Sequence, residues 1–186
     1  MRDVRTVKLG NEVVHQVHGH LYCKMSVDPR QLSLIHPRLH FLVGLLYEFF
    51  GTIRKPMVIT RILAHYGTHY SGRAVDIRTR HLRPETILYA REQVNFAYPY
   101  GTGYDGRRHD TVVFHRQVRC TACGARYEVD PFDGPPADWV CLRCKGTRYT
   151  DYGQHFHVQV RDDGPNWKIW NLPAVRLGEK EETGEV

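Results

Sequence analysis

The chain has 186 residues, of which 41% are hydrophobic and 25% charged, and this is the composition of an ordinary globular protein. The length is enough to bury a sizeable core, so we expect one domain with at most one small added module. A formal charge of +6 suits a polyanionic partner, such as nucleic acid or an anionic cell wall, although a solvated basic surface explains it equally well. The longest apolar run, residues 39–50, is shorter than the roughly 20 residues of a membrane span, so membrane insertion is not expected.

Helix and strand patterns follow one another in the first half of the chain. Residues 1–30 alternate weakly and predict short strands with turns. A helix is predicted to begin at Pro37, which suits the first helical position, and to cover the apolar run. The segments that follow predict a strand at 57–62, a strand at 73–78 with Ala74, Asp76 and Arg78 on one face, and a helix at 84–97.

The second half predicts two strands separated by a cysteine-rich segment. A loop rich in Gly and Tyr at 98–108 precedes a strand at 111–118, and a return strand follows at 155–160. We therefore interpret residues 119–149 as a module inserted into a main domain formed by 1–118 and 150–176. The predicted fold class is α+β, a small antiparallel sheet flanked by helices, with a mobile charged tail at 177–186.

Four of the five cysteines form two Cys-x-x-Cys pairs, Cys120 with Cys123 and Cys141 with Cys144. Two such pairs are typical of a zinc ribbon rather than of a disulfide framework. Four thiolates close the tetrahedral shell of a zinc ion and leave no position for water or substrate, so this zinc is expected to be structural. Gly124 and Gly146 are expected to permit the tight turns, and the remaining Cys23 is expected to be a buried thiol.

A second group of metal ligands is spread over two segments. His69 and Asp76 lie close together in the sequence, and His155 and His157 share one face of the return strand. His69 can reach the same ion from a loop before the Asp76 strand. Two imidazoles and one carboxylate leave the fourth zinc position open for water, which is the arrangement of a catalytic site.

The pattern His69-x-x-Gly72-x-Ala74-x-Asp76, followed much later by His-x-His, resembles the D-alanyl-D-alanine carboxypeptidase and Hedgehog superfamily of zinc peptidases. That superfamily includes many phage endolysins. The resemblance covers roughly residues 55–80 and 150–160, and the cysteine module is not part of the usual pattern. It implies that His69, Asp76 and His157 bind a catalytic zinc, which makes two zinc ions with the structural one. It also implies that Arg61 holds a carbonyl or carboxylate group of the substrate.

The general base is a choice between two residues. Hydrolysis needs a group that takes a proton from water and gives it to the leaving amine. The Hedgehog-like branch of the superfamily places an acid six residues before the last His, and this position corresponds to Asp151. The other choice is His155. If Asp151 is the general base, His155 would instead orient or stabilise the oxyanion.

These patterns lead to one expected function and two alternatives. The expected function is a zinc peptidase, either carboxypeptidase or endopeptidase, that cuts peptidoglycan stem peptides and is encoded by a phage or prophage. The first ten residues lack a signal-peptide core, so the protein is expected in the host cytoplasm before release to the cell wall, or in a virion with other virion proteins as partners. One alternative is a non-catalytic zinc-binding virion or interaction module, because no Glu lies near His157. The other is a nucleic-acid-binding zinc ribbon, which is disfavoured because such a ribbon has no use for an open zinc site.

Overall fold

The computed structural model describes residues 4–64, 67–102, 106–130 and 132–161. The main element of the fold is one sheet of eight strands in the order β1-β2-β3-β4-β5-β10-β8-β9. Its strands are β1 (Arg5–Leu9), β2 (Glu12–His18), β3 (Leu21–Lys24), β4 (Met57–Arg61), β5 (Ala74–Arg78), β8 (Val112–Cys120), β9 (Arg126–Val129) and β10 (Tyr149–Gln159). The other elements are the 3-10 helix η1 (Pro29–Leu34), the helices α1 (Pro37–Thr52), α2 (Gly67–Tyr70) and α3 (Pro84–Ala97), and a separate pair of short strands, β6 (Gly101–Thr102) and β7 (Arg108–His109).

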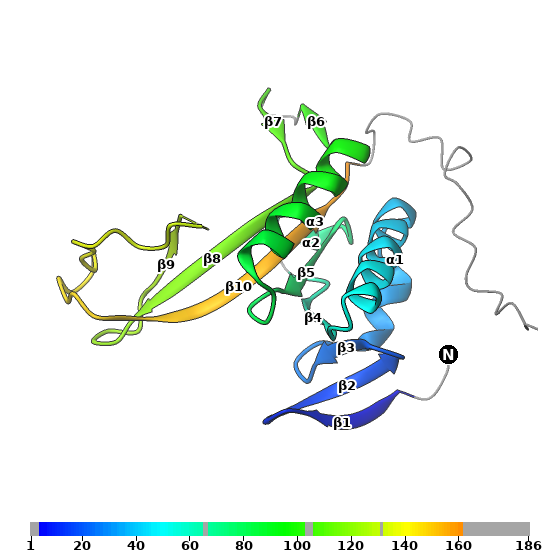
Figure 1. Ribbon diagram of the computed structural model, residues 1–186, viewed down its shortest axis with the longest axis horizontal. Helices are drawn as coiled ribbons and strands as arrows, with labels where there is room; N and C mark the ends of the chain where they lie inside the picture. The colour runs from blue at the N-terminus through cyan, green and yellow to red at the C-terminus, as the bar shows by residue number, and fades with distance from the viewer. Residues whose placement is uncertain (1–3, 65–66, 103–105, 131, 162–186) are drawn as a thin grey trace, which may run out of the picture.

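The helices α1 and α3 lie side by side against one face of the sheet (Figure 1). Each has a proline in its first turn, and α1 is also capped by His36, whose side chain accepts a hydrogen bond from the N–H of Arg38. Each turns a stripe of apolar residues at helical spacing toward the sheet. The buried residues are Leu39, Leu42, Val43, Leu46 and Phe50 in α1, and Ile87, Ala90 and Val94 in α3.

The strand β10 lies between β5 and β8 and is antiparallel to both. Side chains alternate between the two faces of a strand, so Phe156 and Val158 enter the helix-covered core while His155 and His157 point the other way. The same alternation on β5 sends Val75 and Ile77 into the core and Asp76 to the opposite side. We call this opposite side the open face. It is the face of β5, β10 and β8 that carries Asp76, His155, His157 and His115.

The strands β8 and β10 extend beyond the rest of the sheet and carry β9 and the cysteine module at their far end (Figure 1). The module has a small core of its own, formed by Val118, Cys120, Trp139 and Cys141. The boundaries expected after residue 118 and before residue 150 fall inside β8 and β10. Both strands therefore run without a break from the main core into the module.

The α+β class predicted from the sequence is confirmed, but the sheet is larger than expected and not wholly antiparallel. The difference arises at the N-terminal side, where β1, β2 and β3 join the sheet through a parallel pairing of β3 with β4. The helix α1 makes that pairing possible because it returns the chain to the end of the sheet where β3 began. The loop expected at 98–108 contains the β6–β7 pair.

The charged tail expected at 177–186 and the part of the main domain expected at 162–176 lie outside the described residues. Among the helices that the structure describes, none combines the length and hydrophobicity required to span a bilayer.

Candidate functional site

The short helix α2 and the turn after it place His69. The N–H of Gly72 donates to the carbonyl of His69, and the N–H of Arg73 donates to the carbonyl of Thr68, which is the hydrogen-bond pattern of a Schellman helix end. Gly72 has φ +68°, and a Cβ on it would lie 2.8 Å from the carbonyl oxygen of Leu34. Only glycine fits there without strain. The spacing His-x-x-Gly is thus explained by a helix end that aims His69 at the following strand.

The imidazole of His69 is fixed through the nitrogen that faces away from Asp76. Its Nδ1 lies 2.8 Å from the carbonyl oxygen of Ile62, so Nδ1 carries the proton and donates it. Its Nε2 lies 3.2 Å from Oδ1 of Asp76, and both residues are 3% exposed. This contact is a hydrogen bond when Nε2 is protonated, and a metal ion would take the place of that proton, as in histidines that bind metals.

Asp76 lies in a row of side chains that crosses three strands on the open face. The strand register places it opposite His157 on β10 and opposite Arg61 on β4. Its Oδ1 lies 2.9 Å from Nδ1 of His157, and its Oδ2 lies 3.2 Å from Arg61. The second nitrogen of His157, Nε2, is 3.2 Å from the hydroxyl of Thr68. Both histidines are therefore held by α2 and the strands, each with one nitrogen turned toward Asp76.

The donor set fits a divalent metal ion. One ligand atom from each of His69, Asp76 and His157 lies within 4.8 Å of the others. A tetrahedral zinc with bonds of about 2.0–2.2 Å separates its ligand atoms by about 3.4 Å, close to the 2.9 and 3.2 Å contacts that the two histidines make with Oδ1. The structure therefore brings together the three residues that the sequence predicts, and their donors suit zinc.

The charges around the cluster favour an ionised Asp76. Burial acts to raise the pKa of Asp76, but the hydrogen bonds from His157 and His69 and the charges of His69 and His155 hold it well below its ordinary value. Burial lowers the pKa of His155; the charge of Asp76 opposes this, while the charges of His115, His157 and Arg61 act in the same direction as burial. Asp76 is thus ready to act as an anionic ligand, and His155 favours its neutral form.

A second row of side chains lies beside the first. The register places His155 opposite Arg78 on β5 and opposite His115 on β8. The rings of His155 and His115 are stacked, with centroids 5.3 Å apart and planes inclined by 20°. Nδ1 of His115 contacts the Oε1 atom of Glu128 on β9. The sequence assigned no role to His115 and gave no sign of Glu128, because only the pairing of β8 with β9 brings that carboxylate to the histidine.

Asp151 does not join this cluster. The pairing of β10 with β8 shifts by one residue between Asp151 and Gly153, so Asp151 lies opposite Val118 rather than opposite Arg119. This bulge turns it to the side of β8 that carries Arg116, which it contacts at 3.4 Å. Its side chain is 58% exposed, and six residues of strand, about 20 Å, separate it from His157. Of the two residues considered as general base, only His155 lies beside the metal ligands.

A groove of about 360 Å³ begins at the cluster and crosses the open face. Arg61, Asp76 and His155 line one end of it, and Arg61 reaches it with a side chain that is 45% exposed. The position of Arg61 suits a residue that holds a substrate group next to the metal. In this structure it contacts the outer oxygen of Asp76.

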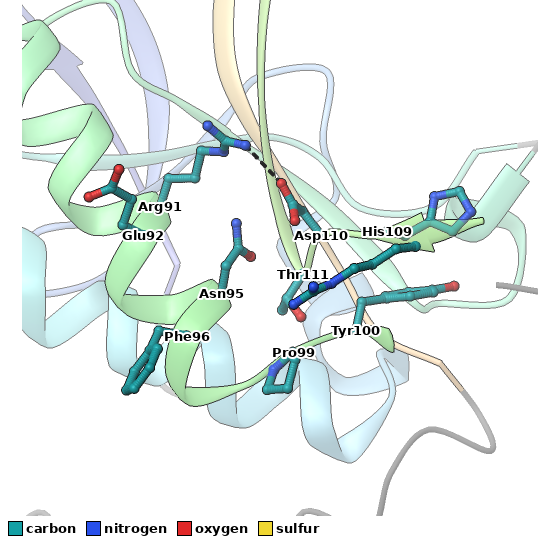
Figure 2. A pocket seen from close by; sticks show the side chains of 10 residues that line it. Arg91, Glu92, Asn95, Phe96, Pro99, Tyr100, His109, Asp110 and Thr111 are labelled. Carbon is teal, nitrogen blue, oxygen red and sulfur yellow. Dashed lines mark hydrogen bonds and ion pairs between the residues drawn. The ribbon is translucent and has the colours of Figure 1, made fainter. Parts of the chain in front are cut away.

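A second cavity, of about 300 Å³, lies between the end of α3 and the start of β8 (Figure 2). The ion pair between Arg91 and Asp110, at 2.8 Å, spans it, and Glu92 and Phe96 line its α3 side (Figure 2). The amide of Asn95 bonds both backbone groups of Val112 and so ties α3 to β8. Neither metal-ligand cluster borders this cavity, so we place the functional site in the groove of the open face.

The four cysteines of the module also converge, as the sequence predicts. The Sγ atoms of Cys120 and Cys144 are 3.6 Å apart, and those of Cys123 and Cys141 are 3.5 Å apart. These separations exceed the roughly 2.05 Å of a disulfide and approach the roughly 3.8 Å of thiolates on one tetrahedral zinc. Burial acts to raise the pKa of Cys141, but hydrogen bonds from the Tyr127 hydroxyl and from backbone N–H groups bring it below its ordinary value.

The tight turns after the two Cys-x-x-Cys pairs differ from the expectation at one residue. Gly124 follows the first pair with φ +73°, as expected. After the second pair the equivalent position is Lys145, with φ +61°, while Gly146 lies outside the left-handed region. A Cβ on Gly146 would lie 3.3 Å from the Cβ of Ala122 and 3.4 Å from Sγ of Cys144, so this glycine allows the two Cys-x-x-Cys turns to pack closely rather than permitting the turn itself.

A scan against protein-family models and searches of curated proteins and of solved structures each give no match to this chain. The residues of the site and their geometry are therefore the basis for the assignment that follows.

Proposed function

We propose that this chain is a zinc-dependent peptidase that hydrolyses peptide bonds in the stem peptides of peptidoglycan, as a carboxypeptidase or an endopeptidase. The observation that carries the proposal is the cluster of His69, Asp76 and His157 at the end of an open groove. Three protein ligands with access for a fourth are typical of catalytic zinc sites, whereas a closed set of four is typical of structural ones. Both kinds of set are present in one chain.

The resemblance of His69-x-x-Gly72-x-Ala74-x-Asp76 and His-x-His to the D-alanyl-D-alanine carboxypeptidase and Hedgehog superfamily supports a peptide as the substrate. The groove supports the same conclusion, because it is lined mainly by polar side chains that can hydrogen-bond a peptide backbone. A phage or prophage origin, with release from the host cytoplasm to the wall or carriage in a virion, belongs to the same proposal. Nucleic acid and membrane are not among the proposed partners.

Each residue of the site has a defined task in this proposal. Zinc, when bound, supplies a Lewis acid that lowers the pKa of water and polarises a carbonyl group. His69 and His157 hold their orientations through Ile62 and Thr68. Arg61 binds the carbonyl or carboxylate oxygen of the substrate next to the cluster, and charge-assisted hydrogen bonds of this kind are the strong ones. An imidazole nitrogen of His155 accepts the proton of the attacking water and passes it to the leaving amine.

The four-cysteine site has a structural task. Its zinc replaces the large core that a segment of this size lacks. It also fixes β9 beside β8, and this places Glu128 against His115 on the open face. The module therefore supports the row of side chains beside the candidate metal ligands without taking part in hydrolysis.

Digestion of purified peptidoglycan tests the proposal. The full chain, loaded with zinc, is incubated with the polymer, and the released fragments are identified by mass spectrometry. We expect new amino and carboxyl ends in the stem peptides, and none with Asp76→Asn at the same structural zinc content. If the wild-type chain carries both zinc ions and cuts nothing, it is a non-catalytic zinc-binding module. DNA binding that disappears with Cys120→Ser would instead identify the ribbon as a nucleic-acid-binding element.

A further inference from the structure

The groove on the open face continues beyond the metal ligands into a strongly basic region. Its far end is lined by Lys24, Arg78 and Arg80 together with a single carboxylate, that of Glu12. Over the whole groove, four basic side chains, with Arg61 as the fourth, face two acidic ones, Glu12 and Asp76. Since Asp76 belongs to the metal ligands, the groove has an excess of positive charge along its length.

The three cations at the far end share Glu12. The Nη atoms of Arg78 lie 2.5 and 2.8 Å from the two carboxylate oxygens, and one Nη of Arg80 lies 3.4 Å from Oε2. The bidentate bond from Arg78 lowers the pKa of Glu12, and the charges of Arg80 and Lys24 act in the same direction. One carboxylate cannot neutralise three cations, so the cluster retains the capacity to bind another anion.

The cluster is also built to receive a ligand. Glu12 fixes Arg78, whose side chain is only 12% exposed, and this removes much of the entropy cost of ordering it on binding. Arg80 and Lys24 are exposed and also line the groove. Arginine is suited to carboxylates because its planar group donates two parallel hydrogen bonds.

The distance between Arg78 and the candidate metal ligands indicates how far a bound substrate carboxylate lies from the bond that is cut. Arg78 follows Asp76 by two residues on the same face of β5, which corresponds to about 7 Å along the strand. An extended peptide spans about 3.5 Å per residue. We propose that Lys24, Arg78 and Arg80 form a subsite for a substrate carboxylate carried one or two residues from the bond that is cut. The position of the cut bond rests on the proposed function, whereas binding of the carboxylate does not.

Matched peptides test this subsite. The probes are N-acetylated, C-amidated alanine pentapeptides with one glutamate at each position in turn, and the same set with glutamine. Titration calorimetry on the zinc-loaded full chain is expected to show the best glutamate peptide binding at least tenfold more tightly than its glutamine counterpart. Arg80→Ala and Lys24→Ala should each reduce that preference about threefold or more. Both side chains are exposed, so the fold is expected to persist, and Lys55→Ala at the other end of β4 is the control with one cation removed.

The outcomes separate the subsite from the peptidase activity. Equal affinity for glutamate and glutamine peptides, or a preference that survives both variants, would overturn the subsite. If glutamate peptides are preferred but purified peptidoglycan is not cut, the subsite stands and the peptidase proposal fails. If peptides are cut equally well with and without glutamate, the peptidase proposal stands and the subsite is overturned. Displacement of the glutamate peptide by a short oligonucleotide at equal concentration would assign the cations to phosphate and overturn the proposal.

Discussion

Glu128, on the strand β9 that belongs to the cysteine module, contacts Nδ1 of His115 on the open face. His115 in turn stacks on His155, two residues from the metal ligand His157 on the same strand. A single carboxylate thus links the structural zinc module to the row of side chains beside the candidate catalytic site. Such carboxylate–histidine contacts fix the orientation and tautomer of the ring.

We predict that Glu128→Gln lowers kcat for peptide hydrolysis by about tenfold while both zinc ions remain bound, because His115 loses the charge that orients it. His115→Gln should lower kcat by a similar factor, and the double variant should be no worse than either, since the two residues act as a unit. Steady-state kinetics with metal analysis provide the measurement, and Glu92→Gln on the exposed side of α3 is the control. Full activity of Glu128→Gln beside an inactive His115→Gln would show that His115 is positioned by something else.

Because of the bulge in β10, we expect substitutions of Asp151 and of His155 to have very different effects on activity. Asp151→Asn should change kcat by no more than about twofold, because the side chain is exposed and lies on the other side of the sheet. His155→Gln should lower kcat by about 100-fold or more, which is the usual contribution of a general base. The pH dependence of kcat should lose its lower limb in His155→Gln alone. A loss of activity in Asp151→Asn with His155→Gln unaffected would reverse this assignment.

Gly72 connects the fold directly to metal binding. Gly72→Ala should destabilise the protein by about 2 kcal/mol or more, since it combines left-handed strain of about 1–2 kcal/mol with a clash against the carbonyl of Leu34. The catalytic zinc should bind more weakly because His69 is displaced. Gly10→Ala is a matched control, because Gly10 has φ +62° and no atom within 4 Å of its Cβ position. Urea unfolding of the two variants separates strain from clash, and equal midpoints would contradict the role of the clash.

The five cysteines should differ sharply in reactivity. In the zinc-loaded chain we expect no rapid alkylation by iodoacetamide at pH 8. After chelation, the four cysteines of the module should react while Cys23 stays unmodified, because burial raises its pKa to about 12 and no part of it is exposed. Cys23 should react only when the chain is unfolded in guanidinium. Mass spectrometry counts the adducts, and modification of Cys23 in the folded chain would contradict its burial.

The metal ligands could be predicted from the sequence because local rules determine their placement. The helix end at Gly72 aims His69, and strand alternation puts Asp76 and His157 on one face. The two site features that the sequence did not predict, the orientation of Asp151 and the contact of Glu128, also have a physical cause. One extra residue at a bulge turns Asp151 to the other face of the sheet. The sequence around it contains no pattern that indicates a bulge. Glu128 reaches His115 only through pairing between strands, which a single sequence does not specify.

The fold likewise combines elements that the sequence predicts with elements that it does not predict. The helices at 37–52 and 84–97 follow from their apolar spacing and from the prolines at their starts. The three N-terminal strands show only weak alternation, so their addition to the sheet through β3 and β4 did not follow from the pattern. That addition matters for function, because it brings Glu12 and Lys24 to the groove.

The central claim is that His69, Asp76 and His157 hold a zinc ion separate from the one in the cysteine module. Metal content per chain, measured by plasma mass spectrometry after zinc loading and desalting, tests it most directly. We predict two zinc ions in the wild-type chain and in the control His40→Ala, whose side chain is exposed on α1, but one in His157→Ala and one in Cys141→Ser. One zinc ion in the wild-type chain, and the same one in His157→Ala, would contradict the claim.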